Sequence, residues 1–290
     1  MESFRILCEE RSFTRAAERL HLTPPGMSQH IAKLEERLGT KLVEREAPGF
    51  ILTEAGEKTL ALARSRWREK RAFLASFDDE DTDKGRLSLT CSGSFATFLY
   101  PRLIEWMAEA PGLSIALDAA PEESIVEGVL SGAVDFGIVS GDQRHPRLAM
   151  ERLGWEHLDL VLPREWQGRT PSLSELQELG YIHHPDGPSY ADLVLGANFA
   201  PDYRGWETLR IRSSVNQIGR NSAPVTGGLG YTILPRSGIL AFPDRDKLSI
   251  APLGQPTLLE LRLIWLKGKT QSKRAEKLAR IVREEAGKLD

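Results

Sequence analysis

The chain has 290 residues, of which 41% are hydrophobic and 27% are charged, and its formal net charge is −3. That length allows two domains and a well-buried core. The slightly acidic balance argues against a protein that binds nucleic acid through overall basicity. No apolar run reaches the roughly 18 residues of a membrane span, and the charged N-terminal stretch lacks the apolar core of a signal peptide. We therefore expect a cytoplasmic protein.

The two cysteines, Cys8 and Cys91, stand far apart in the sequence. This spacing argues against a disulfide framework and against a cysteine-rich zinc site. We interpret both residues as small apolar fillers, with a redox-sensing pair as the alternative.

Charge is distributed unevenly along the chain. Residues 1–58 carry nine Lys or Arg and ten Asp or Glu, which gives −1. Residues 59–77 carry five basic residues and one acidic residue, which gives +4, and residues 78–83 carry five acidic residues. A basic helix followed by an acidic hinge indicates a domain boundary.

The first segment predicts helices joined by a tight turn. Apolar residues recur at three-to-four spacing, and Ser12 and Thr23 can each cap a helix by accepting from a free amide of its first turn. Pro24 and Pro25 fit the first turn of the second of these helices, and Gly39 ends it as a left-handed cap. The inward stripe of that helix is expected to consist of Met27, Ile31, Leu34 and Leu38.

Residues 41–56 predict a β-hairpin, or wing, with a Pro-Gly turn at 48–49. Thr53 then caps a long helix in which Leu60, Trp67 and Leu74 are seven residues apart, with Ala63 and Phe77 on the same seam. Seven-residue spacing is typical of a helix that pairs with a partner helix. The alternative is a helix that packs on its own domain.

From residue 86 the pattern changes to alternating strands and helices. Strands are expected at 86–92, 113–119, 134–140, 180–184, 208–214, 231–235 and 259–269, with helices at 95–109, 122–130 and 273–289. The βαβαβ order predicts a mostly parallel sheet covered by helices. The return of the C-terminus to the first unit predicts two lobes joined by crossing strands.

The stretch from Ser12 to Gly56 resembles the winged helix-turn-helix of LysR-type transcriptional regulators. The stretches "LSGAVDFGIV" and "GGLGYTILP" look like the effector domain of that family, which has the fold of periplasmic solute-binding proteins. The resemblance covers nearly the whole chain. It rests at the N-terminus on Ser12, Phe13, Ala16, Ala17, Leu20, Thr23, Pro25, Ser28, Ile31, Leu34, Glu35, Leu38, Gly39, Leu42, Arg45, Leu52, Thr53 and Gly56.

The resemblance implies a mixed fold in three parts. Residues 1–58 form the DNA-binding domain and residues 59–85 the linker and dimerisation helix with its hinge. Residues 86–290 form an α/β effector domain with lobe I at about 86–160 and 262–290 and lobe II at about 161–261. The family's usual assembly implies a dimer that pairs into a tetramer, with RNA polymerase as a further partner.

A winged helix-turn-helix places its second helix in the major groove, where base edges differ. The short polar side chains that start this helix suit that position, and Gln29 can bond an adenine with two hydrogen bonds. Arg15, Lys33 and Arg45 are candidates for phosphate contacts. For each of these cations, a solvated side chain is the alternative. Our candidate DNA-binding residues are Thr23, Pro24, Pro25, Ser28, Gln29, His30, Lys33 and Arg45.

The sequence departs from the family in three places, one of which is Val43, where the family usually has a phenylalanine. Pro24 stands where the family often has a glutamine that reaches a base, and the wing sequence "EAPGFI" has no cation after Arg45, although the family's wing is usually rich in arginine. We therefore expect weak backbone contacts from the wing.

A small effector is expected in a cleft between the lobes, where strands end. The turn "SGSFAT" opens a helix, and a helix N-terminus favours anions such as carboxylates. Ordinary N-capping by Ser92 or Ser94 is the alternative. The turn "RSSVNQ" is its counterpart in lobe II. Our candidate effector-binding residues are Ser92, Gly93, Ser94, Thr97, Ser140, His184, Asn216 and Gln217.

No metal site, cofactor or catalytic constellation is expected. His183 and His184 are adjacent on a strand and so point to opposite faces, which hinders ligation of one ion beside Asp186. The stretch "TGGLG" precedes a strand, so we interpret it as a turn and not a phosphate loop. We predict a DNA-binding transcription regulator controlled by a small molecule. The alternatives are a two-lobed binding protein or enzyme whose N-terminal helices serve only dimerisation, and an architectural DNA-binding protein.

Overall fold

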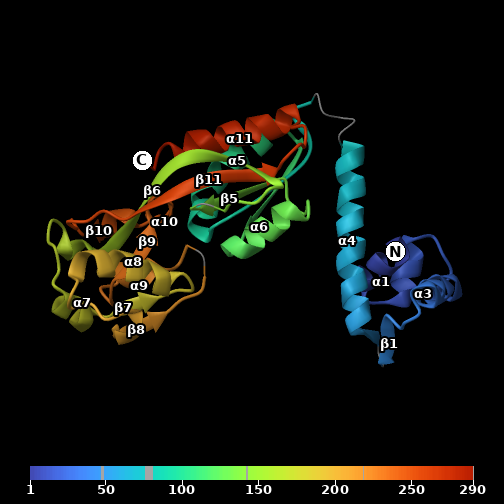
Figure 1. The fold of residues 1–290 in the computed structure, drawn as a ribbon, viewed down its shortest axis with the longest axis horizontal. Coiled ribbons are helices and arrows are strands. Elements are labelled where there is room, and N and C mark those ends of the chain that lie inside the picture. Colours follow the sequence, from blue (N-terminus) through green and yellow to red (C-terminus); the bar gives the residue numbers. More distant parts are fainter. Residues whose placement is uncertain (47–48, 76–80, 142, 218, 290) are drawn as a thin grey trace. The chain divides into compact units, whose positions relative to one another are not determined.

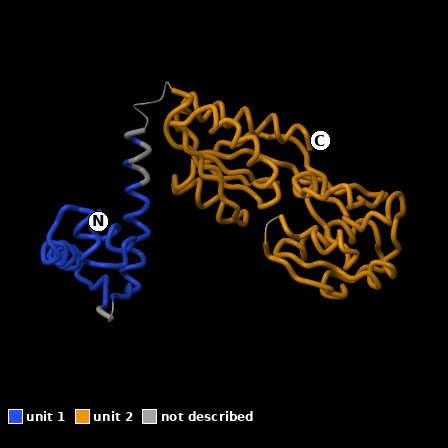
Figure 2. Tube along the Cα trace, turned by 180° about the vertical axis from the view of Figure 1, so that it is seen from behind, with its two compact units in different colours: residues 1–78 blue, residues 79–290 orange. Residues whose placement is uncertain are grey.

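The computed structural model describes residues 1–46, 49–75, 81–141, 143–217 and 219–289, and the side chains of 45, 46, 68, 69, 71, 72, 74 and 75 lie outside that description. The chain divides into two compact units, Met1–Asp78 and Asp79–Asp290 (Figure 2). None of the described helices is both long enough and apolar enough to cross a lipid bilayer.

The first unit, unit 1, contains short helices, a hairpin and a long helix. Its elements are α1 (Glu2–Glu10), α2 (Phe13–Arg19), α3 (Pro24–Leu38), β1 (Val43–Glu46), β2 (Gly49–Leu52) and α4 (Glu54–Ala75). The two strands pair in antiparallel fashion, with Val43 opposite Leu52. This arrangement confirms the predicted helix-turn-helix with a wing.

The predicted caps begin their helices as expected. The hydroxyl of Ser12 accepts from the amide of Arg15 at 3.4 Å, and that of Thr23 accepts from the amide of Gly26 at 3.2 Å. Gly39 ends α3 with a φ of 67°, in the left-handed region that glycine adopts without strain. Thr53 caps α4 in the same way as the other two.

The inward stripe of α3 differs from the prediction at its C-terminal end. Met27 and Ile31 are buried, but Leu38 is 48% exposed, so its expected place in the core is wrong. Leu38 is the last residue of the helix, and the fully buried Leu42 occupies the core beside the helix end. Glu35 takes the inward position instead and is 7% exposed.

The predicted seam of α4 divides into two parts. Leu60 and Ala63 are buried within unit 1, and the ring of Trp67 lies 4.4 Å from the guanidinium carbon of Arg5. This first part of the seam therefore packs on its own domain, as the alternative interpretation holds. The rest of the seam, the side chain of Leu74 and all of Phe77, lies outside the described residues.

The second unit, unit 2, has two lobes built on one long strand (Figure 1). Its strands are β3 (Lys84–Cys91), β4 (Gly112–Ala119), β5 (Phe136–Ser140), β6 (Leu148–Pro163), β7 (Tyr181–His183), β8 (Ile211–Ser214), β9 (Thr232–Pro235), β10 (Leu248–Ile250) and β11 (Leu258–Leu266). Its helices are α5 (Gly93–Glu109), α6 (Glu122–Leu130), α7 (Leu173–Leu179), α8 (Gly187–Phe199), α9 (Ala223–Thr226), α10 (Arg236–Leu240) and α11 (Lys273–Ala286).

Strand β6 runs from one lobe into the other. From Leu148 to His157 it pairs with β11, which pairs with β5, then β3, then β4. From Leu158 onward its partners are β9 and β10. We call the part around β3, β4 and β5 lobe I and the part around β7 to β10 lobe II.

The expected mostly parallel sheet is only partly correct. Strand β3 is parallel to β4 and to β5, but β11 and β6 are antiparallel to the strands they join. Both β6 and α8 lie where no element was expected. Strand β8 begins at Ile211, three residues later than predicted, because a 3₁₀ turn occupies Trp206–Thr208.

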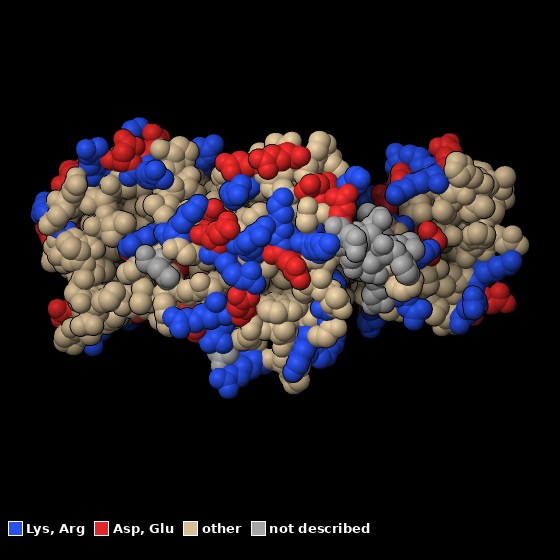
Figure 3. Space-filling view, turned by 90° about the horizontal axis from the view of Figure 1, so that it is seen from above, with Lys and Arg blue, Asp and Glu red and all other residues tan. Residues whose placement is uncertain are grey.

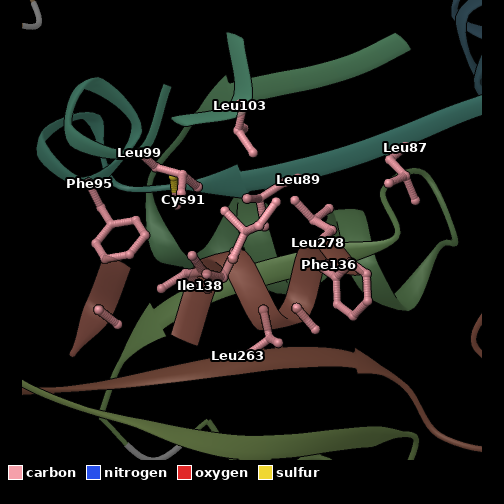
Figure 4. Close-up of a cluster of buried hydrophobic side chains, with 14 of the residues drawn as sticks. Leu87, Leu89, Cys91, Phe95, Leu99, Leu103, Phe136, Ile138, Leu263 and Leu278 are labelled. Carbon is pink, nitrogen blue, oxygen red and sulfur yellow. The ribbon is translucent and has the colours of Figure 1, made fainter. Parts of the chain in front are cut away.

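The core of lobe I lies between its sheet and the helices α5 and α11 (Figure 4). Leucine and phenylalanine side chains fill it, and Phe95, Leu99 and Leu103 are fully buried along one face of α5. Cys91 lies in this core, and burial raises the pKa of its thiol. Burial also raises the pKa of Cys8, to about 11, so both thiols stay protonated at neutral pH. These facts favour apolar fillers over a redox-sensing pair.

Candidate functional site

The N-terminal half of α3 presents polar side chains on the surface of unit 1. Thr23, Pro24, Pro25, Gln29, His30 and Lys33 are exposed, and Ser28 is half-buried. His30 Nδ1 lies 3.0 Å from the hydroxyl of Ser3 in α1. Arg45 belongs to β1, but its side chain lies outside the described residues. The remaining candidate DNA-binding residues therefore share one segment, from the cap of α3 to its third turn.

The carboxylate of Glu35 ties this helix to the wing. It accepts from the amides of Leu42 at 2.8 Å and Val43 at 3.3 Å, and from Lys41 Nζ at 2.8 Å. Burial disfavours the charged form, but the Lys41 ammonium and the two amides outweigh it and hold the pKa of Glu35 below its usual range. The strand that begins the wing is thereby fixed against α3.

A cleft of about 670 Å³ opens in unit 2, and both lobes line it. Lobe I contributes the N-terminus of α5, the start of α6 and the end of β5. Lobe II contributes the segment that leads into α8 and the loop after β8. Of the predicted effector residues, Ser92, Gly93, Ser94, Ser140, His184, Asn216 and Gln217 line this cleft.

Thr97 is the exception among the predicted residues. It is not part of the described lining, and its hydroxyl donates to the carbonyl of Gly93, one turn earlier in α5, at 2.9 Å. At this position in the helix, the backbone carbonyl one turn earlier is the nearest acceptor for a threonine hydroxyl.

Ser92 caps α5 by accepting from the amide of Phe95 at 3.3 Å, so the capping interpretation of this serine is correct. The amides of Gly93 and Ser94 donate to no acceptor within the described chain. They face the end of the helix where the peptide dipoles leave partial positive charge. The start of α5 can therefore hold an anionic group of a ligand.

The two adjacent histidines have separate environments. His184 is 2% exposed, and its Nε2 lies 2.9 Å from the carbonyl oxygen of Ile233. Burial lowers the pKa of His184, so its ring is neutral at pH 7. His183 Nδ1 instead lies 3.2 Å from the hydroxyl of Ser214. Among the described residues, no group of three His, Cys, Asp or Glu is arranged to hold a metal ion.

Sequence reasoning missed several residues of the cleft, namely Glu122, Asp186, Ser189, Tyr190, Leu193 and Asn221. Glu122 follows β4 and accepts from the amide of Ser140 and from Gln143 Nε2, the latter at 3.1 Å. Its place after a strand was the signal that could have found it. Asp186 and Tyr190 lie in the stretch "HHPDGPSY", which the sequence does not connect to any ligand chemistry.

Charge on the surface of unit 2 is mixed. On the face that Figure 3 shows, Lys and Arg side chains are interspersed with Asp and Glu. That face has no broad field of one sign, which a surface that binds nucleic acid by charge alone requires.

Comparison with known protein families gives a match for each of the two units. Residues 1–57 match the family model "Bacterial regulatory helix-turn-helix protein, lysR family", and residues 80–287 match "LysR substrate binding domain". The chain is 32% identical over 247 residues to the HTH-type transcriptional regulator CatR of Pseudomonas putida, a match that covers 81% of each chain.

Solved structures of regulators are similar to this chain over almost its whole length. The chain is 25% identical to CbnR, a LysR family transcriptional regulator, with a TM-score of 0.67 and coverage of 98% of this chain and 97% of that one. Full-length CbnR in complex with its target DNA gives 26% identity and a TM-score of 0.51, with the same coverage. These relatives are regulators and not enzymes, and they do not support the alternative in which the N-terminal helices serve dimerisation alone.

Proposed function

The chain belongs to the LysR family of transcriptional regulators, which join a DNA-binding domain to a substrate-binding domain, and from this membership we propose how its residues divide the work. Residues 1–58 bind the operator, 59–85 link and dimerise, and 86–290 bind an effector between lobe I (86–160 and 262–290) and lobe II (161–261). The observation that carries the proposal is the presence in one chain of a polar, exposed helix start in α3 and a cleft of about 670 Å³ lined by two lobes.

In this proposal α3 lies in the major groove. Ser28, Gln29 and His30 reach base edges, while Lys33 and Arg45 contact phosphates, with the cap and its two prolines at the groove edge. The unpaired amides at the start of α5 bind a carboxylate of the effector. The protein acts in the cytoplasm, where its DNA is, and influences RNA polymerase at the promoter.

We also propose that the protein dimerises through α4 and that dimers pair into tetramers. Leu62 supports this proposal, because it is 49% exposed on the same helix that buries Leu60 and Ala63 in unit 1. An exposed leucine on a long helix gives a second copy of that helix an apolar contact. The effector then acts by binding one arrangement of the assembly more tightly than another.

The test is footprinting of the purified protein on the DNA upstream of its own gene, across a salt series. One or two protected half-sites that weaken steeply with salt are expected, because bound phosphates release counterions. Ala32→Glu adds a negative charge to the exposed face of α3 and should abolish protection. The matched control, Ala197→Glu, adds the same charge to the exposed face of α8 and should leave protection intact. Absence of protection by the wild-type protein at low salt contradicts the proposal.

A further inference from the structure

The walls of the effector cleft are acidic. Glu122 and Asp186 both line it, and the described residues of the lining include neither lysine nor arginine. The histidine of the lining, His184, is neutral and bonded to a backbone carbonyl. A ligand with only negative charge therefore meets two like charges and no cation among the described lining residues, and like charges repel.

The two carboxylates differ in how they are held. The carboxylate of Glu122 accepts hydrogen bonds from the backbone amide of Ser140 and from the side-chain amide of Gln143. Its two oxygens have about four lone-pair positions, so some of them are unused. Asp186 stands at the cap position of α8, and its side chain accepts from no described residue, including the free amides of that helix. Both residues can accept further hydrogen bonds from a ligand.

Tyr190 lines the same cleft as the two carboxylates. Its ring centroid lies 5.7 Å from that of His184, and the two rings are tilted by 58°. Burial raises the pKa of its hydroxyl, and the negative charges of Asp186, Glu156 and Glu122 raise it further. The hydroxyl therefore stays protonated and can donate a hydrogen bond.

A further acceptor lies unused in the lining. The side-chain oxygen Oδ1 of Asn221 is buried and accepts no hydrogen bond from the described chain. A buried acceptor without a donor is unfavourable, and a ligand with spare donors can satisfy it. The cleft thus offers acceptors from both lobes, namely Glu122, Asp186 and Asn221, and the two free amides of Gly93 and Ser94 at the start of α5.

We propose that the effector is a small amino acid, whose protonated amine binds between Glu122 and Asp186 while its carboxylate binds the start of α5. The inference rests on the proposed effector role of this cleft. This proposal refines the expectation of a plain carboxylate. An ammonium group supplies three hydrogen-bond donors, and its positive charge offsets the negative charge of the ligand's carboxylate, which Glu122 and Asp186 repel. Leu193 lines the same cleft and is 49% exposed, so it offers an apolar surface to a hydrocarbon side chain of the ligand.

The test is calorimetric titration of the full-length protein with the twenty common L-amino acids at millimolar concentration. Each is compared with the carboxylic acid that lacks its amine. At least one amino acid should bind, and its deaminated partner should bind about tenfold more weakly or worse, the factor that a lost charge-assisted hydrogen bond gives. If the deaminated acids bind as tightly, or if no amino acid binds, the inference is overturned.

Variants locate the binding. Asp186→Asn and Glu122→Gln should each weaken amino-acid binding about tenfold and leave the binding of deaminated acids unchanged or stronger. The matched control is Glu123→Gln. Glu123 is exposed in the same turn of α6 but lies outside the described lining, so its removal should have no effect. Equal effects of Glu123→Gln and Glu122→Gln contradict the inference.

Failure of the inference is separable from failure of the proposed function. If deaminated acids bind in the cleft and footprints respond to them, the regulator proposal stands and the amine is not required. If amino acids bind as described but the protein gives no salt-dependent footprint, the ligand class stands and the regulator proposal fails.

Discussion

The carboxylate of Glu35 in α3 accepts the backbone amide of Leu42 at 2.8 Å, which ties the helix proposed to read DNA to the first strand of the wing. Leu42 is itself fully buried in the core of unit 1. A carboxylate that is 7% exposed and accepts from two amides and a lysine cannot be removed without leaving those amides unpaired. Glu35 is therefore a positioning residue for the wing.

The first prediction is that Glu35→Gln destabilises unit 1 by about 1–3 kcal/mol, because a neutral amide replaces a carboxylate that accepts from several donors. Hydrogen exchange of the amides in α3 and β1, measured in the full-length protein, should accelerate. The control is Glu36→Gln, which changes the exposed neighbouring residue and should leave exchange unaltered. If the two variants exchange alike, Glu35 does not hold the wing.

The ionisation of Glu35 makes the stability of unit 1 depend on pH. The pKa of Glu35 is lower in the folded state than in the unfolded chain, where a glutamate has a pKa of about 4.3. Its contribution to stability is therefore complete above that value and is lost as the pH falls through the folded pKa. Acid unfolding of unit 1 should begin below about pH 4, and Glu35→Gln should flatten that part of the curve. An unchanged curve for the variant contradicts this assignment.

The ionisation of the buried Glu156 should change the stability of unit 2 with pH in the opposite direction. Burial raises the pKa of its carboxyl, and the negative charge of Asp159 adds to this, although the carboxylate accepts from the amide of Ser237 at 2.8 Å. A folded pKa above the unfolded one contributes stability below about pH 4.3, and this is lost as the pH rises through the folded value.

Glu156→Gln should therefore increase the free energy of unfolding of unit 2 by about 1 kcal/mol at pH 7, since glutamine keeps an acceptor for Ser237 and carries no buried charge. The measurement is urea unfolding followed by near-ultraviolet circular dichroism. The comparison variant is Glu151→Gln, which removes an ion pair with Arg283 and should be neutral or slightly destabilising. A loss of stability in Glu156→Gln contradicts the prediction.

Local features of unit 1 could be predicted from the sequence because their causes lie within a few residues. Thr53 accepts from the amide of Gly56 at 3.0 Å, three residues ahead, which the sequence itself indicates. The role of Glu35 could not be predicted, because its partners lie seven and eight residues away, beyond the end of the helix. The 3.6-residue period that places Met27 and Ile31 correctly also assigns Leu38 to the core, and only the tertiary position of Leu42 changes that assignment.

The cleft was predictable in part for a related reason. Ser92 follows β3 and Ser140 ends β5, so the rule that ligands bind where strands end identifies them. Asp186 is the N-cap of α8 and Tyr190 lies in its first turn, and the sequence conceals this helix because its apolar residues form no stripe. Strand β6 was missed because its first half is partly exposed and its second half, from Leu158, is buried on both faces, so two patterns describe one strand.

Gly56 provides a fourth prediction, for the contact between α4 and the wing. A Cβ added at this position would fall on the backbone carbonyl of Leu42, an atom that cannot move without shifting the wing. Gly56→Ala should destabilise unit 1 by about 1–3 kcal/mol through overpacking. Gly254→Ala is the control, because a Cβ there meets no atom within 4 Å. Thermal unfolding that is equal in the two variants contradicts the predicted clash.

The last prediction separates base contacts from phosphate contacts in α3. Gln29 and Lys33 are both exposed, one turn apart, on the face that we propose enters the major groove. Gln29→Ala should cost about 1–3 kcal/mol on the operator and little on unrelated DNA, because an amide can read a base edge. Lys33→Ala should weaken binding to both DNAs alike and reduce the slope of log K against log salt by about 1. Fluorescence anisotropy on operator and scrambled duplexes across a salt series measures all of these quantities. A changed salt slope in Gln29→Ala, or a loss of affinity confined to the operator in Lys33→Ala, would reverse the two roles. If neither substitution changes DNA affinity, the recognition face lies elsewhere on unit 1.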